Sequence, residues 1–92
     1  MERISQKQLE NLVTHLNIIT GSPINPYTKT ENGIKANIGN YHLDMAYGGY
    51  ALSRMSSEGG GERRISQGGY TTKRALYNWI HAFIAGIELH SK

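Results

Sequence analysis

The stretch IKANIGNYHLDMAYGGYALSRM, residues 34–55, decides the fold, because apolar residues recur at every second position along most of it. This spacing is the two-residue period of a half-buried β-strand. Three strands are predicted, at about 34–38, 41–46 and 50–55, separated by the turn signals Gly39-Asn40 and Gly48-Gly49. Strands joined in chain order by tight turns form a three-stranded antiparallel β-meander.

Two amphipathic helices are predicted on either side of these strands. The first, at about 5–19, begins with the capping-box pair Ser5 and Gln8 and ends before Gly21, which can adopt a left-handed C-cap. The second, at about 72–89, carries an apolar stripe at helical spacing: Leu76, Ile80, Phe83 and Ile87. We therefore expect one α+β domain over residues 1–92, with the N-terminal and C-terminal helices packed on one face of the meander.

The segment SSEGGGERRISQGG, residues 56–69, differs from the rest of the chain. It holds five glycines, four charged residues and one apolar residue. Such a composition buries too little apolar area to offset the entropy lost on ordering. Two alternatives stay open at this stage: a mobile, basic, glycine-rich loop, or a second short hairpin around Gly59-Gly60-Gly61.

The residues needed for common catalytic and metal sites do not come together in this sequence. The absence of cysteine excludes disulfides, thiolate metal sites and cysteine nucleophiles. The four histidines lack metal-binding spacing, although His42 and Asp44 share a predicted strand face. The triple glycine is followed by Glu62-Arg63-Arg64 in place of the lysine of a phosphate-binding loop. We therefore expect a binding protein that is not an enzyme, with no cofactor and no metal.

The net charge of +3 is confined to one part of the chain. Between positions 54 and 74 there are five basic residues and two acidic ones, and five minus two accounts for the whole excess. The basic residues are Arg54, Arg63, Arg64, Lys73 and Arg74. A local positive charge attracts phosphate groups or acidic protein surfaces. The alternative is a solvated face that only keeps the protein soluble.

Tyrosines flank the same region, and tyrosine and arginine are enriched at the energetic centres of interfaces. The predicted partner-binding residues are the five basic residues together with Tyr47, Tyr50 and Tyr70. Tyrosine on a strand is more often a packing residue, so part of this set is expected in the core or at its rim. Lys73 and Arg74 occupy the first turn of a helix, where the dipole disfavours cations, which favours a role toward a partner.

Several runs of sequence carry a resemblance to a known family: Asn25-Pro26-Tyr27-Thr28, residues 36–44 with 46–50, Glu58-Gly59-Gly60-Gly61, and Thr72-Lys73-Arg74-Ala75-Leu76. Over nearly its whole length the chain resembles small phage-encoded accessory proteins. Within that group it is similar to anti-CRISPR proteins that act on the type I-F (Csy) surveillance complex. The resemblance implies stoichiometric binding to the complex in the host bacterial cytoplasm, with contacts to Cas subunits and, as an open alternative, to the guide RNA, so that target DNA cannot hybridise.

Two other classes of function remain as alternatives. A small protein that binds nucleic acid directly would use arginines for phosphates and aromatic rings for bases, and its binding would weaken steeply with salt. A small-molecule binder or minor enzyme would need a convergent pocket that the sequence does not indicate. The first residues, MERISQKQLE, lack the apolar run of a signal peptide, and no stretch of about 20 apolar residues predicts a membrane helix.

Overall fold

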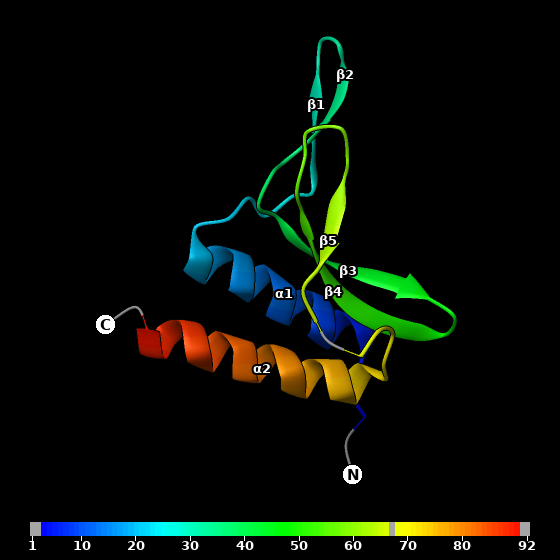
Figure 1. Cartoon of the computed structure of the whole chain (residues 1–92), viewed down its shortest axis with the longest axis vertical. Coiled ribbons are helices and arrows are strands. Elements are labelled where there is room, and N and C mark those ends of the chain that lie inside the picture. The colour runs from blue at the N-terminus through cyan, green and yellow to red at the C-terminus, as the bar shows by residue number, and fades with distance from the viewer. Residues whose placement is uncertain (1–2, 67, 91–92) are drawn as a thin grey trace.

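The structure, a computed structural model, describes residues 3–66 and 68–90 as two helices and five strands. In chain order these are α1 (Gln6–Thr20), β1 (Tyr27–Thr30), β2 (Gly33–Ala36), β3 (Tyr41–Ala46), β4 (Gly49–Met55), β5 (Glu62–Arg64) and α2 (Lys73–His90). The strands form two antiparallel sheets, β1–β2 and β3–β4–β5 (Figure 1). The α+β class and both predicted helices are confirmed.

Local sequence signals set the ends of the helices. Ser5 Oγ accepts a hydrogen bond from the Gln8 amide at 3.1 Å, and the Gln8 side chain accepts one from the Ser5 amide at 2.7 Å. Gly21, with φ of 70°, ends α1 in the left-handed conformation. Thr72 precedes α2, and its Oγ1 accepts from the Ala75 amide at 3.1 Å. Each contact satisfies a backbone group that a helix end leaves without an internal partner.

The predicted meander is wrong in its first strand. Residues of the predicted strand 34–38 pair with β1, in the register Tyr27↔Ala36 to Thr30↔Gly33, and not with β3. The Gly39-Asn40 hairpin does not form, because the side-chain Nδ2 of the buried Asn40 donates to the carbonyls of Pro23 and Ile24 at 2.8 and 3.0 Å. These bonds tie the chain before β3 to the end of the α1–β1 connection.

The exposure of the predicted first strand agrees with this different pairing. Ile34 is 73% exposed and Ile38 is 55% exposed, and of the three alternating apolar residues only Ala36 is buried. The β1–β2 hairpin instead projects from the body that the helices and the larger sheet form (Figure 1). Alternation showed that the segment is a strand, but it carries no information about the partner strand.

The glycine-rich segment forms the second hairpin that the sequence left open. β5 pairs with β4 in the register Ser53↔Arg64, Arg54↔Arg63 and Met55↔Glu62, and residue 67 lies outside the described residues. The tip of this hairpin contacts β2, where the Ala36 amide donates to the Glu58 carbonyl at 3.1 Å and Lys35 Nζ lies 3.3 Å from a Glu58 carboxylate oxygen. β5 is therefore held by β4, and the tip of the hairpin is held by the smaller sheet.

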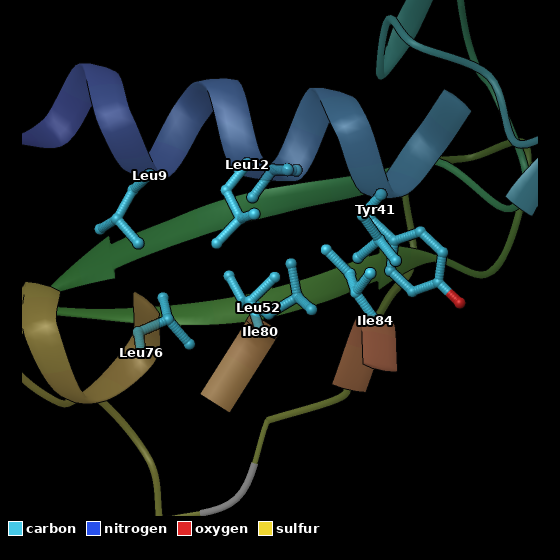
Figure 2. Close-up of a cluster of buried hydrophobic side chains, with 9 residues drawn as sticks. Leu9, Leu12, Tyr41, Leu52, Leu76, Ile80 and Ile84 are labelled. Atoms are coloured by element: carbon cyan, nitrogen blue, oxygen red, sulfur yellow. The ribbon is translucent and has the colours of Figure 1, made fainter. Parts of the chain in front are cut away.

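The hydrophobic core lies where both helices meet β3 and β4 (Figure 2). α1 packs against β3 and against α2, and α2 also packs against β4. The buried cluster comprises Leu9, Leu12, Val13, Leu16, Tyr41, Leu52, Leu76, Ile80 and Ile84. Full burial of such a side chain stabilises the fold by roughly 1.5–3 kcal/mol. This core positions β4, and the C-terminal end of β4 carries Arg54 of the candidate site.

Candidate partner-binding face

Arg54 of β4 and Arg63 of β5 are direct neighbours across the two strands. Residues opposite each other in an antiparallel pair point to the same face, so the two guanidinium groups share one side of the sheet. Within residues 3–66 and 68–90, neither arginine forms an ion pair. Two unneutralised like charges in this position destabilise a strand pair, so the structure gives no local reason for their presence.

Arg54 is held at its inner edge. Its Nε donates to the Gly39 carbonyl at 3.1 Å, and its guanidinium carbon lies 4.8 Å from the centroid of the Tyr41 ring. Stacking on an aromatic ring and a hydrogen bond to a carbonyl together restrict the side chain. The terminal nitrogens of Arg54 therefore remain as preorganised donors at an exposed position.

A hollow of about 340 Å³ lies beside the two arginines. Its walls are Ile38, Gly39, Arg54, Met55, Ser56, Arg63 and Ile65. Ile65 is placed there because its amide donates to the Leu52 carbonyl at 2.9 Å, which continues the β5 side of the hairpin. The hollow combines an apolar floor with two guanidinium groups, an arrangement that suits a flat or apolar group carrying a negative charge.

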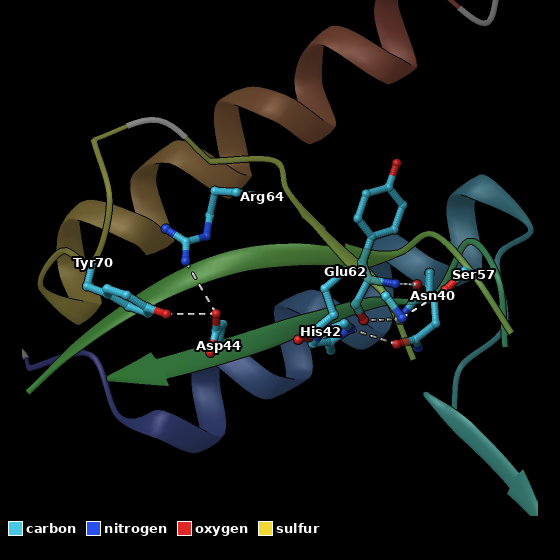
Figure 3. Close-up of polar contacts among 10 residues, drawn as sticks. Asn40, His42, Asp44, Ser57, Glu62, Arg64 and Tyr70 are labelled. Atoms are coloured by element: carbon cyan, nitrogen blue, oxygen red, sulfur yellow. Dashed lines mark hydrogen bonds and ion pairs between the residues drawn. The ribbon is translucent and has the colours of Figure 1, made fainter. Parts of the chain in front are cut away.

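Arg64 faces the other side of the sheet and belongs to a different cluster (Figure 3). Its Nη2 lies 3.3 Å from Asp44 Oδ2, and its guanidinium carbon lies 4.5 Å from the Tyr70 ring centroid. The Tyr70 hydroxyl donates to the same Asp44 oxygen at 2.9 Å. Asp44 therefore pairs with one of the five basic residues that the sequence assigned to a partner.

The environment of Tyr70 shifts its titration. The hydrogen bond to Asp44, then desolvation and the charge of Asp44, raise the pKa of Tyr70 above its ordinary value of 10.0, and Arg64 opposes the shift. Tyr47, which is 97% exposed, places its ring edge-on to Tyr70 with centroids 5.8 Å apart. Three of the predicted residues thus join Asp44 in one polar and aromatic cluster.

His42 and Asp44 share a strand face, but they contact different side chains. His42 contacts Glu62 through Nε2 and the Asn40 side-chain oxygen through Nδ1 at 3.2 Å, whereas Asp44 contacts Arg64 and Tyr70 (Figure 3). Across the described part of the chain, no three His, Asp or Glu side chains come close enough to hold a metal ion. The His42–Glu62 contact instead connects β3 to β5.

The remaining predicted residues lie at the opposite end of β4. Tyr50 pairs with Thr71 through two backbone hydrogen bonds of 2.8 Å, which brings the start of α2, with Lys73 and Arg74, to this end of the sheet. Tyr50 is half-buried and packs against the core. Because Arg54 lies four residues further along β4, roughly 13 Å separate the two ends.

The structure therefore divides the eight predicted residues among three places. Arg54 and Arg63 share the hollow, while the Asp44 cluster and the end of β4 near α2 take the others. Sequence reasoning missed the apolar wall formed by Ile38, Met55 and Ile65, although Ile65 stands out as the one apolar residue of the glycine-rich segment. The sequence indicates Asp44 only as a neighbour of His42 on a strand face, because its pairing with Arg64 depends on the β4–β5 hairpin.

The chain was compared with known protein families, curated proteins and solved structures. No protein-family model, no curated protein and no solved structure matches the chain. In the described residues, neither helix combines the length and apolar character needed to cross a membrane. The resemblance to phage accessory proteins stays a prediction.

Proposed function

We propose that this protein is an anti-CRISPR inhibitor that binds the type I-F surveillance complex of a bacterial host stoichiometrically and blocks recognition of target DNA. The observation that carries the proposal is the Arg54–Arg63 pair beside an apolar hollow, with no carboxylate of the described residues paired to either guanidinium. The sequence resemblance directs the choice of target. The site of action is then the host cytoplasm.

Two guanidinium groups on one face match the chemistry of such a target. A nucleoprotein complex presents the phosphates of its guide RNA and the acidic side chains of its protein subunits, and arginine binds both with paired hydrogen bonds. Arg54 is already oriented by Gly39 and Tyr41, so little side-chain entropy is lost when it binds. A ligand held by both arginines would also bring the β4–β5 hairpin against the complex.

Arg63 and Arg64 are adjacent in sequence, but the proposal gives them different roles. Arg63 has no acidic partner among the described residues, whereas Arg64 pairs with Asp44. Reversing the charge at Arg63 removes a group directed toward a partner. Reversing it at Arg64 places a second carboxylate beside Asp44 and disturbs the sheet, so a loss of function there has two causes.

The decisive test uses the purified type I-F complex with its guide RNA, a labelled target duplex and increasing amounts of this protein. We expect DNA binding to stop at a fixed molar ratio of protein to complex. In the double variant Arg54→Glu with Arg63→Glu, inhibition weakens by at least roughly a hundredfold, because two charge-assisted contacts contribute about 1.5–3 kcal/mol each. Circular dichroism checks that the variant is folded.

A matched control has the same net charge as this double variant, but its substitutions lie far from the hollow. Lys7→Glu with Lys29→Glu alters exposed side chains of α1 and β1 and should inhibit like the wild type. Equal inhibition by the Arg54 and Arg63 variant would remove the hollow from the mechanism. No effect of the wild-type protein on the complex would refute the proposed target.

The hollow also keeps direct binding to nucleic acid as a second candidate function, because an apolar floor beside arginines can accommodate a base and its phosphate. Mobility shifts with free single-stranded RNA and with duplex DNA at two salt concentrations separate the two functions. Binding to free nucleic acid that weakens steeply with salt supports the second candidate. Inhibition of the complex without such binding supports the first.

A further inference from the structure

The outer edge of β3 carries backbone groups that no strand covers. The Asn40 carbonyl accepts from the Met55 amide at 2.8 Å, and pairing continues at His42↔Ser53 and Asp44↔Ala51. Hydrogen-bonding residues alternate along an antiparallel strand, so residues 41, 43 and 45 direct their amide and carbonyl groups away from β4. β3 lies at the end of the strand order in its sheet, so this edge has no neighbouring strand.

The side chain of Asn17 in α1 already binds the backbone of Tyr41, the first outward-facing residue of this edge. Its side-chain oxygen accepts from the Tyr41 amide at 2.8 Å, and its side-chain nitrogen donates to the Tyr41 carbonyl at 2.9 Å. One amide thus makes both bonds that a residue of a neighbouring strand would make. Beyond it, the outward backbone groups of Leu43 and Met45 have no hydrogen-bond partner among residues 3–66 and 68–90.

A groove of about 420 Å³ runs between α1 and this edge. Its apolar wall includes Val13, Ile24, Leu43 and Met45, and Met45 is 53% exposed. Glu10 is the acidic side chain on its rim, and no lysine or arginine of the described residues lines it. The groove therefore offers open backbone hydrogen bonds, a contact surface for alternate apolar side chains and a local negative charge in a protein whose net charge is +3.

We infer that this groove binds an extended segment of a partner protein, which adds as a fourth strand to the edge of β3. The bound segment hydrogen-bonds to Leu43 and Met45, directs apolar side chains at alternate positions against the groove, and carries a lysine or arginine that reaches Glu10. This is recognition by strand addition, in which backbone bonds supply affinity and side-chain contacts supply specificity. The inference is independent of the proposed function, because it uses neither Arg54 nor Arg63.

A second copy of this chain fits the edge less well than a foreign segment. Antiparallel pairing of Leu43 with Met45 of another copy would set the two Asp44 residues directly opposite each other. Like charges at such positions destabilise a strand pair, and the Asp44–Arg64 pair of each copy would have to accommodate a second carboxylate. A basic segment avoids this repulsion and also complements Glu10.

The test selects random linear peptides displayed on phage against the full-length protein. Enriched peptides should alternate apolar and polar residues and contain lysine or arginine. On adding such a peptide, the amides of Leu43 and Met45 should become protected from hydrogen exchange, as measured by NMR on the wild-type protein. Glu10→Gln should weaken binding of the basic peptides several-fold, because a charge-assisted contact is lost.

Met45→Pro removes one outward amide without removing a bond to β4, since proline is tolerated on an edge where the amide faces solvent. It should weaken peptide binding roughly tenfold, whereas Met45→Leu, which keeps the amide, should bind like the wild type. Failure to enrich extended peptides, or protection elsewhere than at Leu43 and Met45, would overturn the inference. A wild-type dimer that Met45→Pro converts to a monomer would also overturn it, in favour of a second copy.

Discussion

Replacement of Asn17 by alanine tests whether one side-chain amide holds the start of β3 in place. Asn17 is 1% exposed and Tyr41 is buried, so the variant leaves the Tyr41 amide and carbonyl without protein partners at a largely buried position. Each buried unsatisfied group costs about 1–3 kcal/mol. Because the edge of the sheet admits some water to these groups, we expect the free energy of unfolding to fall by about 2–4 kcal/mol.

Urea unfolding followed by circular dichroism measures this loss, as a lower midpoint with an unchanged slope. Asn11→Ala is the matched control, because Asn11 is exposed on the same helix, and helix propensity makes the change neutral or slightly stabilising. A loss below about 1 kcal/mol for the Asn17 variant would contradict the reasoning, since it is less than one unsatisfied group costs. Equal effects of the two substitutions would likewise show that the amide does not anchor β3.

Two further predictions concern the end of β4 near α2. Gly49→Ala should destabilise the protein by about 1–3 kcal/mol in the same urea assay, because an added Cβ would lie 2.9 Å from the Tyr70 Cβ; Gly59→Ala, where nothing lies within 4 Å, should not destabilise it. Asp44→Asn should lower the pH at which Tyr70 titrates, followed by ¹³C NMR of its ring, because Asp44 is the main cause of its raised pKa. A raised pKa stabilises the protonated phenol, so its contribution to wild-type stability is complete below pH about 10 and is lost as the pH rises through the folded-state value. An unchanged titration in the variant would assign the shift to another group.

The arginine hollow shows how far residue types could be interpreted before the fold was known. Arg54 and Arg63 were predicted as partner-binding residues from charge and composition, and the structure places them beside one hollow. Their separation from Arg64 could not be predicted, because it depends on β5, which forms only when the glycine-rich segment pairs with β4. In a strand, neighbouring residues point to opposite faces, so Arg63 and Arg64 diverge once that pairing exists.

The strand pairing shows a different limit. The Gly39-Asn40 signal is a good hairpin turn locally, and Gly39 does adopt a positive φ of 96°. The hydrogen bonds of Asn40 to Pro23 and Ile24 connect residues that lie 17 and 16 positions apart, and no local pattern contains them. These contacts direct the chain away from the expected hairpin.

The sequence by itself determined both helices, the α+β class and the location of the charge, because caps, apolar periodicity and residue type act within a few positions of each other. Only the tertiary structure decided which strands pair, which guanidinium groups are neutralised and which edge of β3 stays open. Those features depend on contacts between distant segments, above all the side-chain amides of Asn17 and Asn40, whose partners are set by the packing of α1 and its connection to β1 against the larger sheet.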